Sequence, residues 1–172
     1  MSGYSPIAAD FDNDGDVDIL ATQENDYACF YRNDGSWNFT QRNDTGAEIH
    51  GGDIRGATIF DYDSDGDLDL FAARADMFNV LLQNNLESSN NFLNITAEGP
   101  QGDRGGFGTK MWLYEQGHLN DSSYLMSYSQ VLSANGHISQ SSPTQHFGLG
   151  AHTSCDILVR FIDGSFTVKR SV

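Results

Sequence analysis

The sequence predicts an all-β fold in which two similar blade-like repeats are packed with a small antiparallel β-sandwich. Three observations favour this fold. An acidic segment at 10–20 recurs at 61–71, short apolar runs follow each copy, and no long stretch of the 172 residues has the 3.6-residue apolar period of a helix. We expect the repeats to occupy residues 1–88 and the sandwich to occupy residues 89–172.

The repeat is visible in the residues themselves. Residues 10–20 (DFDNDGDVDIL) align with residues 61–71 (DYDSDGDLDLF), an offset of 51 residues, and the alignment continues without gaps to place Asn33 on Asn84. A period near 50 residues is typical of folds in which each repeat forms one supersecondary unit. The two copies are therefore expected to share one local structure.

Each repeat is expected to contain short strands after its acidic segment. Runs 17–21 and 68–72 are apolar on both alternating faces, as in a strand that is buried on both sides. No strand is expected before the first acidic segment. The other strands expected in the repeats lie at 28–32, 37–40, 56–60 and 79–83.

The pattern changes from about residue 90, where short apolar runs alternate with turns rich in Gly, Asn and Ser. Such a pattern is typical of a small antiparallel sandwich. The expected strands lie at 92–95, 109–114, 155–161 and 165–168.

The composition disfavours several classes of partner. Twenty-four acidic against nine basic residues give a formal charge of -15, so nucleic acid and anionic membrane surfaces would repel the chain. No apolar run approaches the roughly 20 residues of a membrane span. No secretory signal segment is visible in residues 1–9. Because the acids cluster in the two repeated segments, a local cation is the partner that the charge favours.

The acidic segments have the ligand pattern of a calcium loop. D-x-D-x-D-G-D-x-D offers carboxylates at positions 1, 3, 5 and 9, a glycine for the sharp turn at position 6, and a main-chain carbonyl at position 7. One such loop nearly supplies the six to eight oxygens that calcium takes, so the sequence predicts two Ca²⁺ sites. The expected ligands are Asp10, Asp12, Asp14, Asp18 and the carbonyl of Asp16 in the first loop, and Asp61, Asp63, Asp65, Asp69 and the carbonyl of Asp67 in the second.

Three other interpretations of these loops are weaker. An EF-hand needs a bidentate Glu at position 12, where this chain has Ala21 and Ala72. Magnesium prefers a tight octahedron and retains its waters. A solvated acidic turn leaves the repulsion between carboxylates unrelieved, at about 1 kcal/mol per pair in water and about 4 kcal/mol near a protein surface.

At these residues the two repeats resemble FG-GAP/VCBS repeats, the calcium-binding blades of integrin-type β-propellers and of many secreted proteins. The second half is similar to the ASPIC/UnbV domain, which follows such repeats in cartilage acidic protein and in bacterial surface proteins. The resemblance implies β-propeller-blade-like repeats and an extracellular or cell-surface location. The residues that carry the second resemblance are 105–110 (GGFGTK), Ser139, Gln140, 146–150 (HFGLG), Asp163 and Gly164.

The resemblance leaves one edge of the expected fold incomplete. Propellers close with about four to eight blades, whereas this chain has two. Either upstream blades are missing or another copy supplies the missing edge by strand addition. An exposed β edge is also an assembly surface, which makes a homo-oligomer or filament a candidate state.

The function predicted from the sequence is an extracellular, calcium-stabilised structural, adhesion or assembly module that mediates protein–protein contacts, either as a fibre subunit or as part of a larger surface protein. The alternative is a carbohydrate-binding module of a secreted protein, which needs an exposed aromatic platform. Either function would leave the chain without catalytic residues. Core packing is the expected use of most aromatic side chains in the sequence. Those that could stack on sugar rings are Tyr27, Trp37, Trp112, Tyr114, Tyr124 and Tyr128.

Catalytic motifs are absent from the sequence. His137 and His146 could pair with Asp103, Glu115 or Asp156, but their spacing matches no known acid–base or metal motif. His146 is expected in a glycine-flanked turn, where packing and a main-chain hydrogen bond explain it. We therefore do not expect an enzyme.

Two kinds of modification site remain open. Cys29 and Cys155 are either one long-range disulfide or two buried thiols. N-x-S/T triplets are candidate glycosylation sites in a secreted protein. These triplets begin at Asn38, Asn43, Asn94 and Asn120.

Overall fold

The computed structural model describes residues 3–23, 28–45, 54–85, 88–99, 102, 106–134 and 139–172. In these residues the chain forms thirteen strands and one three-residue 3-10 turn, with no α-helix, which confirms the all-β prediction. The chain divides into two compact units. Unit 1 comprises Met1–Asp12, Asp16–Ser88 and Ala134–Ser141, and unit 2 comprises Asn13–Gly15, Ser89–Ser133 and Ser142–Val172.

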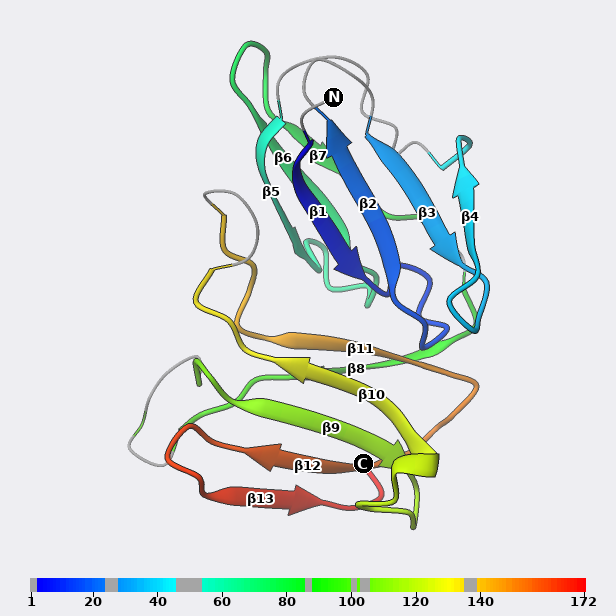
Figure 1. The fold of residues 1–172 in the computed structure, drawn as a ribbon, viewed down its shortest axis with the longest axis vertical. Coiled ribbons are helices and arrows are strands. Elements are labelled where there is room, and N and C mark those ends of the chain that lie inside the picture. Colours follow the sequence, from blue (N-terminus) through cyan, green and yellow to red (C-terminus); the bar gives the residue numbers. More distant parts are fainter. Residues whose placement is uncertain are drawn as a thin grey trace. The chain divides into compact units, whose positions relative to one another are not determined.

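The first repeat of unit 1 is a four-stranded antiparallel sheet in the order β1-β2-β3-β4 (Figure 1). Its strands agree with the expected ranges within a few residues, except for β1, which was not expected. The bounds are β1 (Gly3–Ala9), β2 (Asp18–Gln23), β3 (Cys29–Asn33) and β4 (Phe39–Arg42).

Strand β1 corrects the expectation that no strand precedes the first acidic loop. It pairs with β2 from Ala9 opposite Asp18, so the loop is a hairpin connection between two strands. The sequence around Pro6 did not indicate a strand, because proline cannot donate a main-chain hydrogen bond to a neighbouring strand. Here Pro6 lies on the edge strand next to a shift in register, where a missing main-chain N–H is tolerated.

The second repeat of unit 1 is a three-stranded antiparallel sheet in the order β5-β6-β7. Strands β2 and β6 both begin at position 9 of their acidic loops, at Asp18 and Asp69, as the repeat predicts. The described residues include no counterpart of β4 in this repeat. The bounds are β5 (Ile54–Phe60), β6 (Asp69–Arg74) and β7 (Val80–Leu82).

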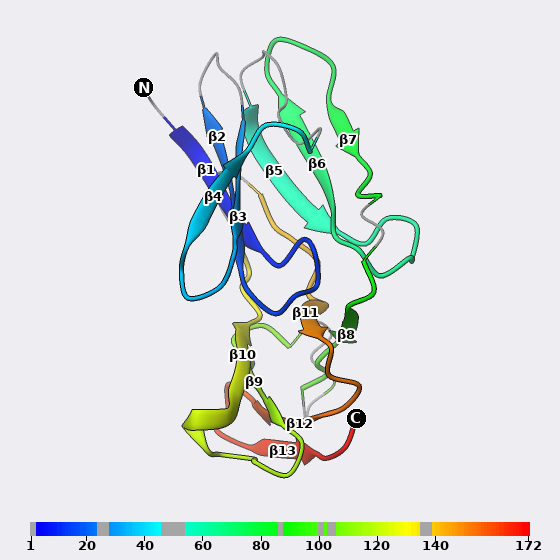
Figure 2. The same ribbon diagram turned by 90° about the vertical axis from the view of Figure 1, so that its right-hand side faces the viewer.

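The two sheets of unit 1 face each other across an apolar core (Figure 2). The first repeat turns one face of its strands toward this core, and the second repeat turns the opposite face of the equivalent strands toward it. In the first repeat the buried residue on β2 is Leu20, which aligns with the outward-facing Phe71 of the second repeat. In the second repeat the buried apolar residues on β6 are Leu70 and Ala72, and Leu70 aligns with Ile19. The repeats therefore stack in one direction, like successive blades. The buried core residues are Leu20, Ala28, Phe30, Ile54, Ala57, Leu70 and Ala72.

Unit 2 consists of two antiparallel sheets, with the orders β10-β9-β12-β13 and β11-β8. Both sheets contribute to one apolar core, which includes Met111 and Leu113 of β9 and Phe147 of β11. The bounds are β8 (Asn91–Ile95), β9 (Lys110–Glu115), the 3-10 turn η1 (Ser122–Tyr124), β10 (Leu125–Gln130), β11 (Gln145–Gly150), β12 (Cys155–Arg160) and β13 (Phe166–Lys169).

Two strands of unit 2, β10 and β11, were not expected. In β11 the glycines indicated a turn, and that interpretation of His146 is wrong, because Gly148 and Gly150 lie within the strand and pair with β8. A shift in register lies between these glycines, and Gly150 adopts a φ of +56°. Glycine inside a strand marks such a bulge or a close backbone approach.

Candidate metal centres

The two acidic loops have matching left-handed backbone angles at positions 4 and 6. Position 4 is left-handed in both, with φ of +60° at Asn13 and +65° at Ser64. Position 6 is also left-handed, with φ of +97° at Gly15 and +96° at Gly66. Glycine adopts such angles without steric cost, and Asn tolerates them better than most residues. The D-x-D-x-D-G pattern thus specifies a tightly curved loop in each repeat.

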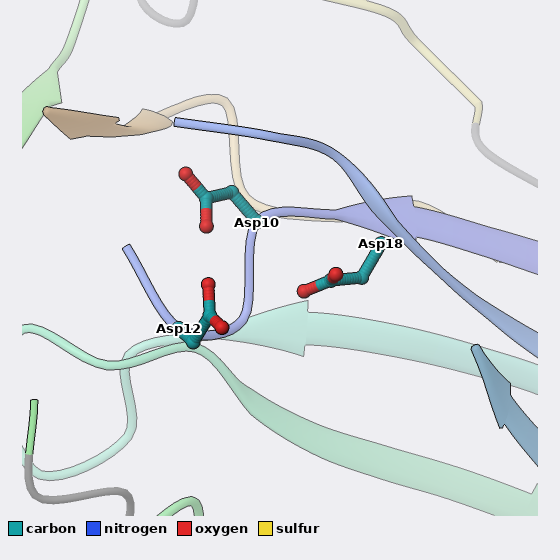
Figure 3. Close-up of side chains that lie close together, drawn as sticks. All are labelled: Asp10, Asp12 and Asp18. Carbon is teal, nitrogen blue, oxygen red and sulfur yellow. The ribbon is translucent and has the colours of Figure 1, made fainter. Parts of the chain in front are cut away.

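The first loop brings together Asp10, Asp12 and Asp18 (Figure 3). One carboxylate oxygen from each lies within 4.8 Å of the others. Asp10 and Asp12 precede the tip of the loop and Asp18 begins β2, so the cluster spans both sides of the hairpin connection. It is largely shielded from solvent, since Asp10 is 8% exposed and Asp18 is 1% exposed.

The second loop brings together Asp61, Asp63 and Asp65, again with oxygens within 4.8 Å of one another. Asp61 is partly buried, whereas Asp63 and Asp65 are exposed. The loop is also tied internally, because the main-chain N–H of Asp67 donates to Oδ1 of Asp65 at 3.0 Å. The clusters of the two loops therefore differ in composition and in burial. The remaining predicted ligands, which these clusters do not include, are Asp14 and Asp16 in the first loop and Asp67 and Asp69 in the second.

The aspartates at position 9 have a role that the sequence did not indicate. Asp18 accepts hydrogen bonds from the main-chain N–H groups of Phe11, at 3.1 Å, and Asn33, at 2.8 Å. Each carboxylate therefore fastens the start of its loop to the chain at or just after the end of the second strand that follows the loop, which is β3 in the first repeat and β7 in the second. The equivalent bonds run to Asp69 from Tyr62, at 2.6 Å, and from Asn84, at 2.8 Å.

A signal for this role was present in the repeat alignment. Asn33 falls on Asn84 at the same offset as the acidic loops, and both follow a strand. An identical residue outside the ligand pattern indicates a structural partner for the loop.

One buried oxygen tests whether these residues fit a cation. Oδ1 of Asp61 is buried and accepts no hydrogen bond from the described residues, although Oδ2 accepts one from the N–H of Gly66 at 3.2 Å. A buried acceptor left unsatisfied costs about 1–3 kcal/mol, and more when it is charged. Burial also raises the pKa of Asp67, and the nearby carboxylates, led by Asp65, raise it further.

A divalent cation would relieve both effects, because it would bind the unsatisfied lone pairs of this buried oxygen and offset the crowded negative charge. Carboxylate and carbonyl oxygens are the ligands that hard cations such as Ca²⁺ prefer. In the first loop the corresponding oxygen, Oδ1 of Asp10, is likewise buried. The residues present therefore fit a calcium ion in each loop.

An open cavity of about 630 Å³ lies within unit 1, beside the first loop. Phe11, Asp12 and Asn84 contribute to its wall, and the side chains of Leu20 and Phe30 contribute apolar surface. The chain that follows β7 therefore meets the first loop at a solvent-accessible edge.

Two of the catalytic candidates, His146 and Asp156, have hydrogen-bond partners in the structure. The His146 ring lies between two amides of unit 2, with Nδ1 2.9 Å from Oδ1 of Asn94 and Nε2 2.6 Å from Oδ1 of Asn13, and it stacks on Phe92. Asp156 is 1% exposed and accepts hydrogen bonds from the main-chain N–H groups of Gly117 and Ser171, both at 3.1 Å. Glu115 lies at the end of β9. Asp103 and His137 fall outside the described residues.

The structure also describes the two cysteines and the four candidate glycosylation asparagines. Cys29 lies on β3 of unit 1 and is partly buried, while Cys155 lies in the core of unit 2, and neither forms a disulfide. Burial raises the pKa of the Cys155 thiol, and Asp156 raises it further. The four triplet asparagines, Asn38, Asn43, Asn94 and Asn120, are all exposed.

In the described part of the chain, no helix has the length and apolar character that crossing a membrane requires. No curated protein gives a significant match to the sequence. Two family models do match. Residues 10–72 match the FG-GAP-like repeat, which includes both acidic loops, and residues 99–172 match the model for ASPIC and UnbV, which includes β9 to β13. A match to an FG-GAP-like repeat is thus followed by a match to an ASPIC/UnbV domain, the architecture that the sequence resembles.

Proposed function

We propose that this chain is an extracellular interaction module whose two acidic loops are each ordered by a calcium ion. The observation that carries the proposal is the convergence of three carboxylates in each loop, together with the buried Oδ1 of Asp61 that accepts no hydrogen bond from the described residues. The FG-GAP-like match agrees with this chemistry, because such repeats often bind Ca²⁺ and are typically extracellular.

The calcium ion would supply positive charge and coordination to oxygens that otherwise repel one another. Loop carboxylates and carbonyls outside the two clusters are available to complete each shell. The proposal assigns no catalytic step to this chain. The residues that would hold the ions are Asp10, Asp12 and Asp18 in the first loop and Asp61, Asp63 and Asp65 in the second.

Apolar surface supports contacts with other proteins. Phe78 is 92% exposed and Met77 is 52% exposed at the turn between β6 and β7. Leu81 of β7 is 43% exposed, and it is the cross-strand neighbour of the partly buried Phe71 of β6. Their equivalents in the first repeat, Leu20 and Phe30, are buried in the core between the sheets. The partners proposed are therefore other protein surfaces, including copies of this chain.

Calorimetric titration with calcium tests the metal sites. The intact chain should bind two ions, while Asp12→Asn and Asp63→Asn should each bind one, because each substitution removes a carboxylate from one cluster. Sedimentation velocity with and without calcium then tests association, for which the sedimentation coefficient should rise with calcium. No heat of binding, or binding that both substitutions leave unchanged, would contradict the proposal.

The second candidate function is carbohydrate binding, which one aromatic residue favours. Trp37 is 80% exposed in the turn between β3 and β4, and its φ is +62°, an angle uncommon for a bulky residue. An exposed indole can stack on a sugar ring. A glycan array probed with the intact chain and with Trp37→Ala separates the two functions, because only glycan binding requires this indole.

A further inference from the structure

We propose that Asn84 is a positioning residue that couples the two acidic loops, so that a cation in one loop raises the affinity of the other. This inference rests on the proposed calcium sites and concerns how they communicate. It is carried by a continuous set of hydrogen bonds within unit 1 that begins at the second loop and ends at the first.

The second loop fixes the backbone of Asn84. Its N–H donates to Oδ1 of Asp69 at 2.8 Å, and the other oxygen of Asp69 accepts from the N–H of Tyr62, at position 2 of the second loop, at 2.6 Å. Asp69 is 1% exposed, so solvent does not compete for these bonds. Any change in the path of the second loop therefore acts on the position of Asn84.

The side chain of Asn84 acts on the first loop. Its Nδ2 donates to the carbonyl oxygen of Phe11 at 2.8 Å. Phe11 lies between Asp10 and Asp12, which supply two of the three carboxylates in the first cluster. The N–H of Phe11 also donates to Asp18, the third member. The main chain between Asp10 and Asp12 is thus held by a side chain of the second repeat.

A second bond holds the same peptide segment. Oγ of Ser88 donates to the main-chain oxygen of Asp12 at 3.1 Å. The chain that follows β7 therefore reaches the first loop at two successive carbonyls, those of Phe11 and Asp12.

The matching asparagine of the first repeat provides an internal control. The N–H of Asn33 donates to Asp18 at 2.8 Å, just as that of Asn84 donates to Asp69. Its side chain stays within its own repeat, where Nδ2 donates to the oxygen of Val17 at 3.3 Å and Oδ1 accepts from the N–H of Gly35 at 3.2 Å. Asn33 and Asn84 thus share the main-chain bond, and their side chains differ in whether they bond to the other repeat.

The coupling should change affinity by about two- to tenfold, which is the range that the net contribution of one hydrogen bond allows. It must also be reciprocal, because the effect of the first site on the second equals the effect of the second on the first. Reciprocity distinguishes coupling from a structural contact that merely supports one loop.

The test is a calcium titration of the full chain followed by NMR, in which the amide signals of Phe11 and Tyr62 report the two loops separately. With Asn84 present, Asp63→Asn should weaken calcium binding at the first loop by about two- to tenfold. Asp12→Asn should weaken calcium binding at the second loop by the same factor. In an Asn84→Ala background either effect should fall below about twofold. Asn33→Ala should leave the coupling intact.

A metal-free measurement supplements the titration. Asn84→Ala should shift the amide signals of Phe11 and Asp12 in the presence of a chelator, and Asn33→Ala should shift them less, because only the Asn84 side chain bonds to the Phe11 carbonyl.

The outcomes separate this inference from the function on which it rests. Two calcium sites that titrate independently in the wild type would overturn the coupling alone, whatever the behaviour of Asn84→Ala. The same conclusion follows if coupling persists undiminished in Asn84→Ala. Failure of both loops to bind calcium would overturn the proposed function and this inference together.

Discussion

The two acidic loops share a nine-residue pattern and nearly identical left-handed angles, yet they gather different carboxylates. In the first loop the cluster uses positions 1, 3 and 9 and is largely buried, whereas in the second it uses positions 1, 3 and 5 and is mostly exposed. The first loop is contacted by Asn84 and Ser88, which follow β7 in the second repeat. The comparison teaches that one local pattern can set the same left-handed angles in two loops whose carboxylate clusters and tertiary neighbours differ.

The largest expected effect tests what the loops share. Asp18→Ala and Asp69→Ala should each destabilise the metal-free chain by about 3–5 kcal/mol, because each leaves two main-chain donors without their charged acceptor. The two losses should be similar, since the bonds are equivalent. Urea unfolding in the presence of a chelator measures both.

Asp18→Asn and Asp69→Asn are the matched controls for this prediction. Each keeps the shape of the side chain and one acceptor oxygen, so each should cost less than the alanine substitution. A near-neutral effect of either alanine variant would show that the two loops are not fastened in the same way.

The next effect concerns what differs between the loops. Calcium at 100 times its dissociation constant should add about 2.7 kcal/mol per site, so a chelator should lower the melting temperature by about 5–10 °C for each site. We expect tighter binding at the first loop, because Coulombic attraction is screened less where carboxylates are buried. Melting curves of Asp12→Asn and Asp63→Asn measure how much of the calcium-dependent stability each loop contributes.

In these curves Asp12→Asn should lose more of the calcium-dependent stability at low calcium concentration. If Asp63→Asn loses more, burial does not rank the sites. A melting temperature that excess chelator leaves unchanged would show that calcium stabilises neither loop.

A smaller effect tests the shared backbone. Gly15→Ala and Gly66→Ala should each destabilise the chain by about 1–2 kcal/mol, because an L side chain at a φ near +97° is strained. A Cβ at Gly15 would meet its nearest neighbour, the carbonyl oxygen of Gly148, at 3.9 Å, which is ordinary contact. Denaturation midpoints should therefore fall by similar amounts, and unequal losses would indicate different strain.

The smallest effect is confined to the first repeat. The Thr40 hydroxyl and the Arg32 guanidinium donate hydrogen bonds to Asp34 and lower its pKa below the ordinary value of 3.8. A lowered folded-state pKa contributes stability above the unfolded value, and this contribution is lost as the pH falls through the folded value. The second repeat has Asn85 at this position and should lack the effect.

Urea midpoints of the wild type and of Asp34→Asn, compared at pH 7 and again below the pKa of Asp34, measure this contribution. The wild type should be slightly more stable at pH 7, and the difference should vanish at low pH. A difference that persists at low pH would assign the effect to packing instead of charge.

Much of the fold could be predicted from the sequence, and the physical reason differs between elements. The loops and the strands β2 and β6 follow from a repeated pattern with one geometric solution. Strand β1 contains a proline and β11 contains two glycines, so local propensity opposed strands that tertiary pairing stabilises. The ligand pattern predicted four carboxylates per loop, but the hydrogen bond from Asn84 to the carbonyl of Phe11 joins residues far apart in the sequence, and no local pattern specifies it.

The direction of stacking in unit 1 limits how copies of this chain could associate. The core joins the Leu20 face of one repeat to the Leu70 face of the next, which are not equivalent surfaces. An association through the equivalent outer faces, with the Phe71 face of one copy against the Ile19 face of the next, would be heterologous, so no twofold axis would close it at a dimer. Growth would continue until the rotation per step closed a ring, or without limit if it did not, and the resulting particle would have two unlike ends.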